Sequence, residues 1–330
     1  MMDFTIRFQV PPLPDKIRHT DKILLAGSCF TEHIGAFLGN AKFKTLVNPN
    51  GIIFNPVSIV KAITSWIENR EYENKDLFQH NDGWHSWDHH SHFSHRDAGR
   101  GLENINTSIQ AAHRFLKEAG WLIITLGSAF VYELKEKDNF IVANCHKMPG
   151  ERFRKRLLVP EEIIAAFGNL VYRLQLLNPE LKIIFTISPV RHIRDGVVEN
   201  NRSKAVLIQA VHHLVEKLDN LHYFPAYEIV MDELRDYRFY AEDMIHPNET
   251  AIRYVAEQFQ KACIDPEIFP LIKELQKLDA AIKHRPFDAE SALHQQFLQA
   301  HLKKAAALKE KYPYMDMKKE IAYFSHFIRE

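Results

Sequence analysis

The sequence predicts an α/β fold in which a parallel sheet is covered by helices on both faces. Short, almost continuous apolar segments alternate along the chain with longer segments whose apolar residues recur every three to four positions. Continuous apolar runs are typical of parallel strands buried on both faces, and the longer period is typical of amphipathic helices. The alternation of the two favours a doubly wound sheet.

The expected elements follow the chain in order. The apolar runs predict strands at Lys22–Ala26, Phe43–Val47, Trp121–Leu126, Lys182–Ile187 and His222–Pro225. The periodic segments predict helices at about Cys29–Leu38, Pro56–Arg70, Leu102–Ala119, Pro160–Leu177, Asn201–Leu218 and Pro247–Cys263. Ligands of such folds bind beyond the carboxyl ends of the strands, so reactive side chains are expected just after each strand.

Three segments do not fit the alternation. Phe130–Asn144 is typical of a hairpin around a Lys-Asp-Asn turn. The insertion at about 77–96 is polar and rich in His and Trp, which predicts a lid, a binding loop or a disordered segment rather than regular structure. From Asp265 onward only helical patterns remain. We expect an α/β domain over 1–264 and a helical extension over 265–330, which packs against the domain or against a second copy of the chain.

The composition is that of an ordinary globular protein. Among 330 residues, 42 Lys and Arg balance 42 Asp and Glu, so no chain-wide positive field is available for nucleic acid or anionic lipid. No apolar run has the roughly 18–20 residues of a membrane-spanning helix, and the N-terminus does not resemble a secretory signal. Cys29, Cys145 and Cys263 are widely separated. A cytoplasmic protein without a disulfide framework, nucleic-acid partner or membrane is expected.

The first expected strand ends in the segment AGSCFTE, residues 26–32. Gly27 permits a tight turn, which places Ser28 at a strand-to-helix junction with its hydroxyl at the top of the sheet. Two interpretations remain open. Ser28 is either the N-cap of the helix, with Glu32 near the reciprocal capping position, or a nucleophile whose oxyanion is stabilised by backbone N–H groups at the helix start.

A second motif lies near the end of the α/β part, where residues 241–248 read AEDMIHPN. Asp243 and His246 are three residues apart, just before a helix that begins at Pro247. At this spacing the carboxylate can accept the Nδ1–H of the imidazole while Nε2 faces a serine, as a Ser-His-Asp triad requires. The alternative is a helix-entry turn with a capping aspartate. Together with Ser28 the pair favours catalysis, with Ser28 Oγ in hydrogen-bond reach of His246 Nε2.

These motifs resemble those of a known family. Residues 27–31, GSCFT, are similar to the signature of the GSCFA domain family, which is related to the SGNH (GDSL-like) hydrolases. Similar blocks follow at 48–56 (NPNGIIFNP), 126–132 (LGSAFVY), 144–147 (NCHK), 188–196 (SPVRHIRDG) and 201–205 (NRSKA). The resemblance covers about residues 20–262. It implies a flavodoxin-like three-layer sandwich in which Ser28, Asp243 and His246 are catalytic.

The resemblance also implies oxyanion donors from a glycine in the second block and from the Asn of a GxN motif in the third. This chain departs from that pattern, because Ala129 stands where the Asn would be. Losing such a donor costs about 2.7–4 kcal/mol of transition-state stabilisation, so a replacement is expected. The candidates are Asn50, Asn55 and the backbone N–H groups of Ser28 and Gly51.

Other residues at the same edge are further candidates for substrate binding. Ser128 follows a strand and Gly127, as Ser28 follows Gly27, and is the weaker candidate nucleophile. Arg191, His192 and Arg194 follow the fourth strand, where they either bind an anionic group of the substrate or form a loop salt-bridged to Asp195.

Five histidines crowd the insertion: His85, His89, His90, His92 and His95. They suggest either a divalent metal site or a substrate-binding lid. Only His85 and His89 have the i, i+4 spacing of helical metal ligands, so we expect no metal and no cofactor.

The sequence therefore predicts a serine hydrolase that cleaves an ester of a small molecule or carbohydrate, such as an O-acyl group, through an acyl-enzyme. An alcohol in place of water would make it an acyltransferase. Two alternatives remain: a non-catalytic carbohydrate- or protein-binding module on the same fold, and a metal-dependent hydrolase that uses the histidines of residues 85–95.

Overall fold

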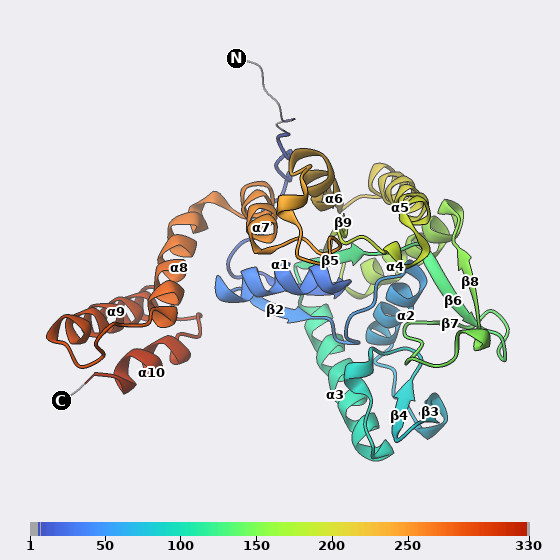
Figure 1. The fold of residues 1–330 in the computed structure, drawn as a ribbon, viewed down its shortest axis with the longest axis horizontal. Coiled ribbons are helices and arrows are strands. Elements are labelled where there is room, and N and C mark those ends of the chain that lie inside the picture. The colour runs from blue at the N-terminus through green and yellow to red at the C-terminus, as the bar shows by residue number, and fades with distance from the viewer. Residues whose placement is uncertain (1–5, 7, 329–330) are drawn as a thin grey trace.

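The computed structural model describes residues 6 and 8–328 and shows a five-stranded parallel sheet between two layers of helices (Figure 1). The strands lie in the order β10-β9-β5-β1-β2, which is the flavodoxin-like order. The predicted doubly wound sheet is confirmed. The strands of this sheet are β1 (Lys22–Gly27), β2 (Lys44–Val47), β5 (Trp121–Leu126), β9 (Lys182–Ile187) and β10 (Leu221–Phe224).

The helices divide between the two faces because side chains alternate along each strand. Leu24 of β1 belongs to one hydrophobic core, whereas its neighbours Ile23 and Leu25 belong to the other. The first core is covered by α2 (Pro56–Ile67), α3 (Ala98–Lys117), α4 (Pro160–Leu177) and α5 (Val197–Lys217). The second is covered by α1 (Cys29–Asn40), α6 (Ala226–Glu228) and α7 (Glu249–Cys263).

A small antiparallel sheet extends from the carboxyl end of β5. The predicted hairpin is present as β6 (Phe130–Leu134) and β7 (Ile141–Val142). A third strand, β8 (Phe153–Leu157), pairs with β6 and was not predicted. Its sequence is FRKRL, but Arg154 and Arg156 both pair at 2.5 Å with the buried carboxylate of Glu133. Ion pairing therefore accommodates a charged strand that lacks the expected apolar pattern.

The insertion is more regular than the sequence predicted. It contains an antiparallel hairpin of β3 (Leu77–His80) and β4 (Gly83–Ser86). Asn81 in the connecting turn has φ 50°. Because tight hairpin turns need residues that tolerate positive φ, the Asn-Asp-Gly sequence at this turn was a signal for a hairpin. The expectation of an irregular segment was wrong.

The C-terminal residues form α8 (Phe269–Lys283), α9 (Ala292–Lys311) and α10 (Lys318–His326), as the helical pattern predicted. These helices extend sideways from the α/β body (Figure 1). Leu271 and Leu275 of α8 share a hydrophobic core with Phe30 and Ile34 of α1. Within residues 6 and 8–328, no helix is both long enough and apolar enough to cross a membrane.

Candidate active site

The turn between β1 and α1 is held by backbone contacts that only glycine permits at residue 27. Gly27 has φ +142°, and a Cβ on it would stand 2.2 Å from the carbonyl oxygen of Thr125 on β5. The N–H of Gly27 donates to Oδ1 of Asn48 at 2.9 Å, and the N–H of Ser28 donates to the Thr125 carbonyl at 3.1 Å. The position of Ser28 is therefore determined by two neighbouring strands.

The hydroxyl of Ser28 does not cap the helix that begins after it. Ser28 occupies the N-cap position of α1 without a side-chain capping hydrogen bond. It is 2% exposed, and among the described residues its Oγ has no hydrogen-bond partner. A buried hydroxyl without a partner is unfavourable. The capping interpretation has no support in this geometry, and the hydroxyl is left available for chemistry.

Asp243 and His246 form the pair that their spacing predicts. The Nδ1–H of His246 donates to Oδ2 of Asp243 at 2.6 Å. Oδ1 of Asp243 accepts the backbone N–H groups of His246 at 3.0 Å and of Ile245 at 2.9 Å. Hydrogen bonds from His246 and Ile245 lower the pKa of Asp243 to about 2. The ionised carboxylate holds the imidazole proton on Nδ1, which leaves Nε2 able to accept a proton.

The turn that carries this pair is attached to the loop after β9. The N–H of Arg191 donates to the carbonyl of Ile245 at 3.3 Å. The Arg191 guanidinium lies over the rings of Tyr240 at 4.4 Å and Tyr237 at 5.3 Å. Arg191 was a candidate for binding an anion, but these contacts indicate that it positions the segment that carries His246.

His246 lies at the same edge of the sheet as Ser28. The N–H of Arg191, which follows β9, donates to the carbonyl of Ile245 beside His246, and Ser28 follows β1. The carboxyl ends of parallel strands meet at one edge of the sheet. The expected hydrogen bond between Ser28 Oγ and His246 Nε2 is not formed, since Ser28 Oγ has no partner among the described residues. Such bonds are often long in unliganded active sites and tighten when the substrate binds.

The side chains of Asn50 and Asn55 are engaged in local structure. Oδ1 of Asn50 accepts the indole N–H of Trp66 at 2.7 Å, and its Nδ2 donates to the carbonyl of Asp88 at 3.3 Å. Asn55 is the N-cap of α2: Oδ1 accepts the N–H of Ser58 at 2.8 Å, and Nδ2 donates to the Ser58 hydroxyl at 2.9 Å. These contacts account for the positions of both side chains, so neither residue needs an oxyanion role to explain its presence.

The backbone donors at this edge are engaged as well. The N–H of Gly51 donates to the carbonyl of Asn48 at 2.7 Å. The N–H groups of Gly127 and Ser128 both donate to the carbonyl of Phe54, at 2.8 and 3.1 Å. Together with the contact of the Ser28 N–H to Thr125, this removes the backbone candidates that the sequence suggested.

Ser128 has a structural role in the described geometry. Its hydroxyl accepts the N–H of Phe130 at 3.1 Å and shares a hydrogen bond with the hydroxyl of Ser203 at 3.2 Å. Unlike that of Ser28, this hydroxyl is therefore engaged, which favours Ser28 as the nucleophile.

A cavity of about 640 Å³ lies beside this edge, between the end of β5 and the small antiparallel sheet. Phe54, Ser128 and His192 are among the residues that line it. The lining also includes aromatic side chains of the small sheet and cationic residues, namely Phe130, Tyr132, Phe153, Lys147, Lys155 and Arg194. The volume suits a small ligand. Asp195 pairs with Lys155 of β8 rather than with an arginine of its own loop.

Lys204 on α5 connects the residues that follow β5 and β9. It is 1% exposed, and its Nζ donates to the carbonyls of Gly127 at 2.6 Å and Ser188 at 2.7 Å. Burial lowers its pKa to about 7. No pattern in the sequence indicated this role, because a lysine in an amphipathic helix is usually exposed.

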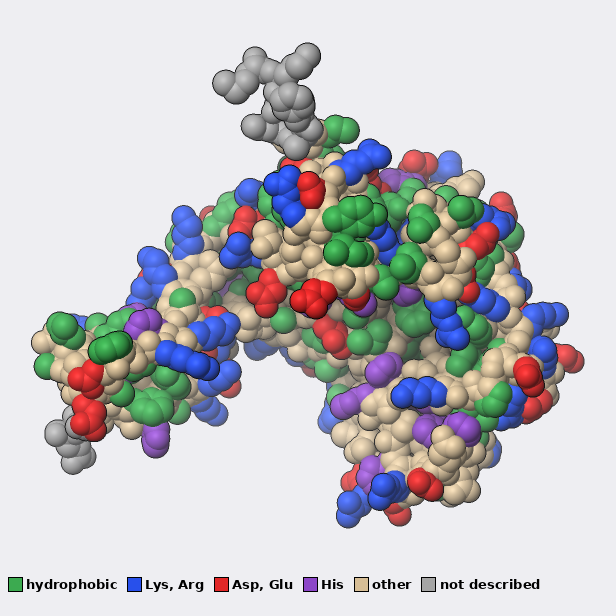
Figure 2. All heavy atoms as spheres, viewed as in Figure 1, with side chains coloured by type: hydrophobic (Ala, Val, Ile, Leu, Met, Phe, Trp, Pro, Cys, Tyr) green, Lys and Arg blue, Asp and Glu red, His purple; other side chains and the backbone are tan. Residues whose placement is uncertain are grey.

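Several histidines of the insertion form hydrogen bonds with protein groups. Several histidine side chains gather on the lower part of the face in Figure 2. The Nδ1 of His85 pairs with Ser94 Oγ at 2.7 Å and its Nε2 with the carbonyl of His80 at 3.1 Å. In the described part of the chain, no three His, Cys, Asp or Glu side chains are placed to hold a metal ion. The metal-dependent alternative therefore has no support in this geometry.

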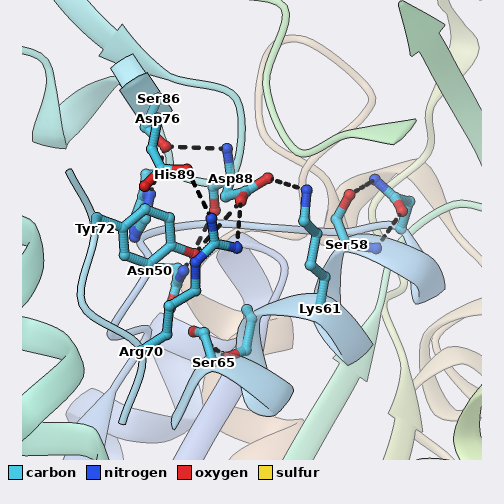
Figure 3. Close-up of polar contacts among 12 residues, drawn as sticks. Asn50, Ser58, Lys61, Ser65, Arg70, Tyr72, Asp76, Ser86, Asp88 and His89 are labelled. Carbon is cyan, nitrogen blue, oxygen red and sulfur yellow. Dashed lines mark hydrogen bonds and ion pairs between the residues drawn. The ribbon is translucent and has the colours of Figure 1, made fainter. Parts of the chain in front are cut away.

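A buried polar network attaches the insertion to α2 (Figure 3). Asp88 accepts the ammonium of Lys61 at 2.5 Å and the hydroxyl of Tyr72 at 3.4 Å. His89 is fully buried, and its Nδ1 pairs with the hydroxyl of Ser86 at 2.9 Å. The network therefore gives this part of the insertion a structural role, because it holds the segment against α2.

The free energy of unfolding is expected to fall as the pH is lowered from 6.5 to 4. Burial lowers the pKa of His89 to about 4, so in this range the unfolded chain binds a proton that the folded chain does not. Each such histidine contributes a slope of up to about 1.4 kcal/mol per pH unit. Urea unfolding at several pH values should show a smaller slope for His89→Gln than for the wild type. The exposed His92→Gln is the control, and equal slopes in all three proteins would contradict the assignment.

The parallel sheet has the order that the motif resemblance implied, with Ser28 after its first strand and the Asp243–His246 pair before α7. The chain belongs to the GSCFA family, whose model matches residues 22–259. A second model, the GSCFA domain protein C-terminal domain, matches residues 275–330. The resemblance that the motifs indicated is confirmed.

A search of curated proteins finds no match. Similar solved structures include a carbohydrate esterase family 3 from Talaromyces cellulolyticus, at 12% identity and a TM-score of 0.36 over 77% of this chain and 99% of that chain. Another is a Clostridium thermocellum family 3 carbohydrate esterase, at 11% identity and a TM-score of 0.36 over 78% of this chain and 98% of that chain. Similarity of this degree identifies neither an activity nor a substrate.

Proposed function

We propose that this protein is a serine esterase that removes an O-acyl group from a carbohydrate or a small metabolite through an acyl-enzyme. The observation that carries the proposal is the Asp243–His246 pair, with Nδ1–H on the carboxylate at 2.6 Å, at the sheet edge where the Ser28 hydroxyl is buried and unbonded. A serine becomes a nucleophile when an oriented imidazole accepts its proton.

The reaction follows from these groups. Nε2 of His246 accepts the hydroxyl proton as Ser28 Oγ attacks the ester carbonyl, and Asp243 stabilises the imidazolium. Collapse of the tetrahedral intermediate breaks the bond to the alcohol, which leaves with the proton of His246. Water, deprotonated by the same Nε2, then hydrolyses the acyl-enzyme and releases a carboxylic acid. An alcohol that takes the place of this water would receive the acyl group instead.

The test compares the wild type with Ser28→Ala. We expect the wild type to hydrolyse 4-nitrophenyl acetate and O-acetylated sugars and to be labelled by a fluorophosphonate, and the variant to lose both. Ser65→Ala is the matched control, because Ser65 is also buried but its hydroxyl donates to the carbonyl of Ala62 within α2. Equal labelling of wild type and Ser28→Ala would refute the proposal.

One observation favours a second candidate, a non-catalytic module that binds a carbohydrate. The aromatic cavity is lined by Phe54 and His192 but not by Ser28 itself. This candidate predicts that the wild type binds a sugar ligand in calorimetry, that Ser28→Ala binds it equally, and that neither protein hydrolyses an ester.

A further inference from the structure

The oxyanion of the proposed reaction lacks an obvious hydrogen-bond donor. Ala129 has no polar side chain, and its N–H donates to the hydroxyl of Ser203 at 2.7 Å. The N–H groups of Ser28, Gly51 and Gly127 are engaged, as described above. A buried oxyanion without donors is strongly disfavoured, so an efficient esterase needs a further donor close to Ser28.

One side chain at this position has a buried polar atom without a partner. Among the described residues, Nε2 of His192 makes no hydrogen bond. It lies 3.2 Å from the point where a Cβ on Gly127 would stand, and Cβ of Ser28 lies 3.4 Å from the same point. The imidazole nitrogen and the serine side chain therefore flank Gly127 together, and glycine leaves space between them.

We propose that His192 donates a hydrogen bond from Nε2–H to the carbonyl oxygen of the ester as negative charge develops there. This inference rests on the proposed esterase function and adds a catalytic residue to it. It gives His192, which the sequence suggested only as a group for a substrate anion, a direct contact with the reacting atoms.

The backbone and the ring of His192 each have a neighbour that positions them. Its backbone N–H donates to Oδ1 of Asn200 at 2.8 Å, and Asn200 is 4% exposed. Its ring lies against Phe54, with the centroids 5.3 Å apart. Both rings also line the cavity of about 640 Å³, through which a substrate can approach. A donor held in this way needs little reorganisation during the reaction, which makes its hydrogen bond effective.

The charge state of His192 suits a donor rather than a base. Burial, followed by the charges of Lys204 and His246, lowers the pKa of His192 to about 4. At neutral pH the ring is uncharged and carries one N–H. It is then a weak base, and of these two histidines it is His246 whose Nδ1 binds a carboxylate that stabilises a gained proton. His246 can therefore transfer the proton while His192 stabilises the oxyanion.

Asn48 is another buried donor close to Ser28, but it lines a different space. Its Oδ1 accepts the Gly27 N–H, and its Nδ2 has no partner among the described residues. Asn48 lines a space of about 10 Å³ against Ile59 and Trp66 of α2. A space of this size holds at most one water molecule, so no ester reaches this donor.

The test uses His192→Ala and His192→Gln in the full chain, with 4-nitrophenyl acetate as the probe. Loss of one oxyanion donor lowers kcat about 10²–10³-fold, so we expect this loss in His192→Ala with KM changed only a few-fold. The Gln amide restores an N–H donor, and His192→Gln should recover most of the lost kcat. The acid limb of the kcat/KM profile should keep its wild-type position in both variants, since His246 remains the base.

His222→Gln is the matched control, because Nε2 of His222 is also buried without a partner, but on β10 beside Trp121 at the other end of the sheet. It should retain wild-type kcat.

Unchanged kcat in His192→Ala would overturn the inference while leaving the esterase proposal intact. Loss of the acid limb together with activity in both His192 variants would also overturn it, since His192 would then be the base. The esterase proposal would be refuted by a different result, namely equal fluorophosphonate labelling of the wild type and Ser28→Ala.

Discussion

Replacing Asp243 by Asn is expected to lower kcat for ester hydrolysis about 10³–10⁴-fold while the protein stays folded. Oδ1 of residue 243 accepts two backbone N–H groups, so an Asn would keep its oxygen there and turn its NH₂ toward Nδ1 of His246. Nδ1 would have to become the acceptor, which moves the imidazole proton to Nε2. In that tautomer the imidazole cannot take the proton of Ser28.

Steady-state kinetics and thermal unfolding of Asp243→Asn check this expectation. Asp265→Asn is the matched control, because Asp265 also accepts a backbone N–H two residues later, from Glu267 at 3.0 Å, at the start of the C-terminal helices. The control should keep wild-type activity. A kcat of Asp243→Asn within tenfold of the wild type would show that the tautomer is not held by this carboxylate, and the catalytic role of the pair would have to be abandoned.

Replacing Gly27 by Ala is expected to reduce the free energy of unfolding by about 4 kcal/mol or more. The new Cβ would stand 2.2 Å from the carbonyl oxygen of Thr125 and 2.8 Å from its nitrogen, both of which are backbone atoms of a central strand. The positive φ of +142° adds strain for any residue with a Cβ. β1 and β5 would have to separate at the point where Ser28 is held.

Denaturant unfolding of Gly27→Ala measures this loss, and absence of folded protein is its extreme form. Gly168→Ala is the control within α4, where nothing lies within 4 Å of the added Cβ. That change should instead stabilise the protein by about 0.5–1 kcal/mol, since Ala is favoured over Gly in a helix. Equal stability of Gly27→Ala and the wild type would show that the turn before Ser28 relaxes easily.

The fold could be predicted well because its strands are locally distinctive. Lys182–Ile187 was predicted with the bounds that the structure shows, since an apolar run buried on both faces needs no knowledge of its neighbours. β8 could not be predicted in this way. Its arginines suit a strand only because Glu133, more than twenty positions earlier in the sequence, lies buried opposite them.

The candidate site also has features that could be predicted from the sequence and features that could not. The contact between Asp243 and His246 follows from a local turn, and its geometry could be expected from a spacing of three residues. The engagement of Asn50 and Gly51 by Trp66 and Asn48 depends on how separate segments meet, so their availability as donors could not be judged from the sequence. The same holds for His192, whose proximity to Ser28 arises because β1 and β9 both lie beside β5, after which Gly127 follows.

The ammonium of Lys204 has a mechanical consequence. An amine that has lost its water shell is confined to the two carbonyls it holds, at Gly127 and Ser188, because any displacement would leave it unsolvated. α5 is thereby pinned against β5 and β9 at their tips. The loops that bear Gly127 and His192 are therefore coupled to one another. We expect this part of the molecule to stay rigid while neighbouring segments adjust to a bound ligand.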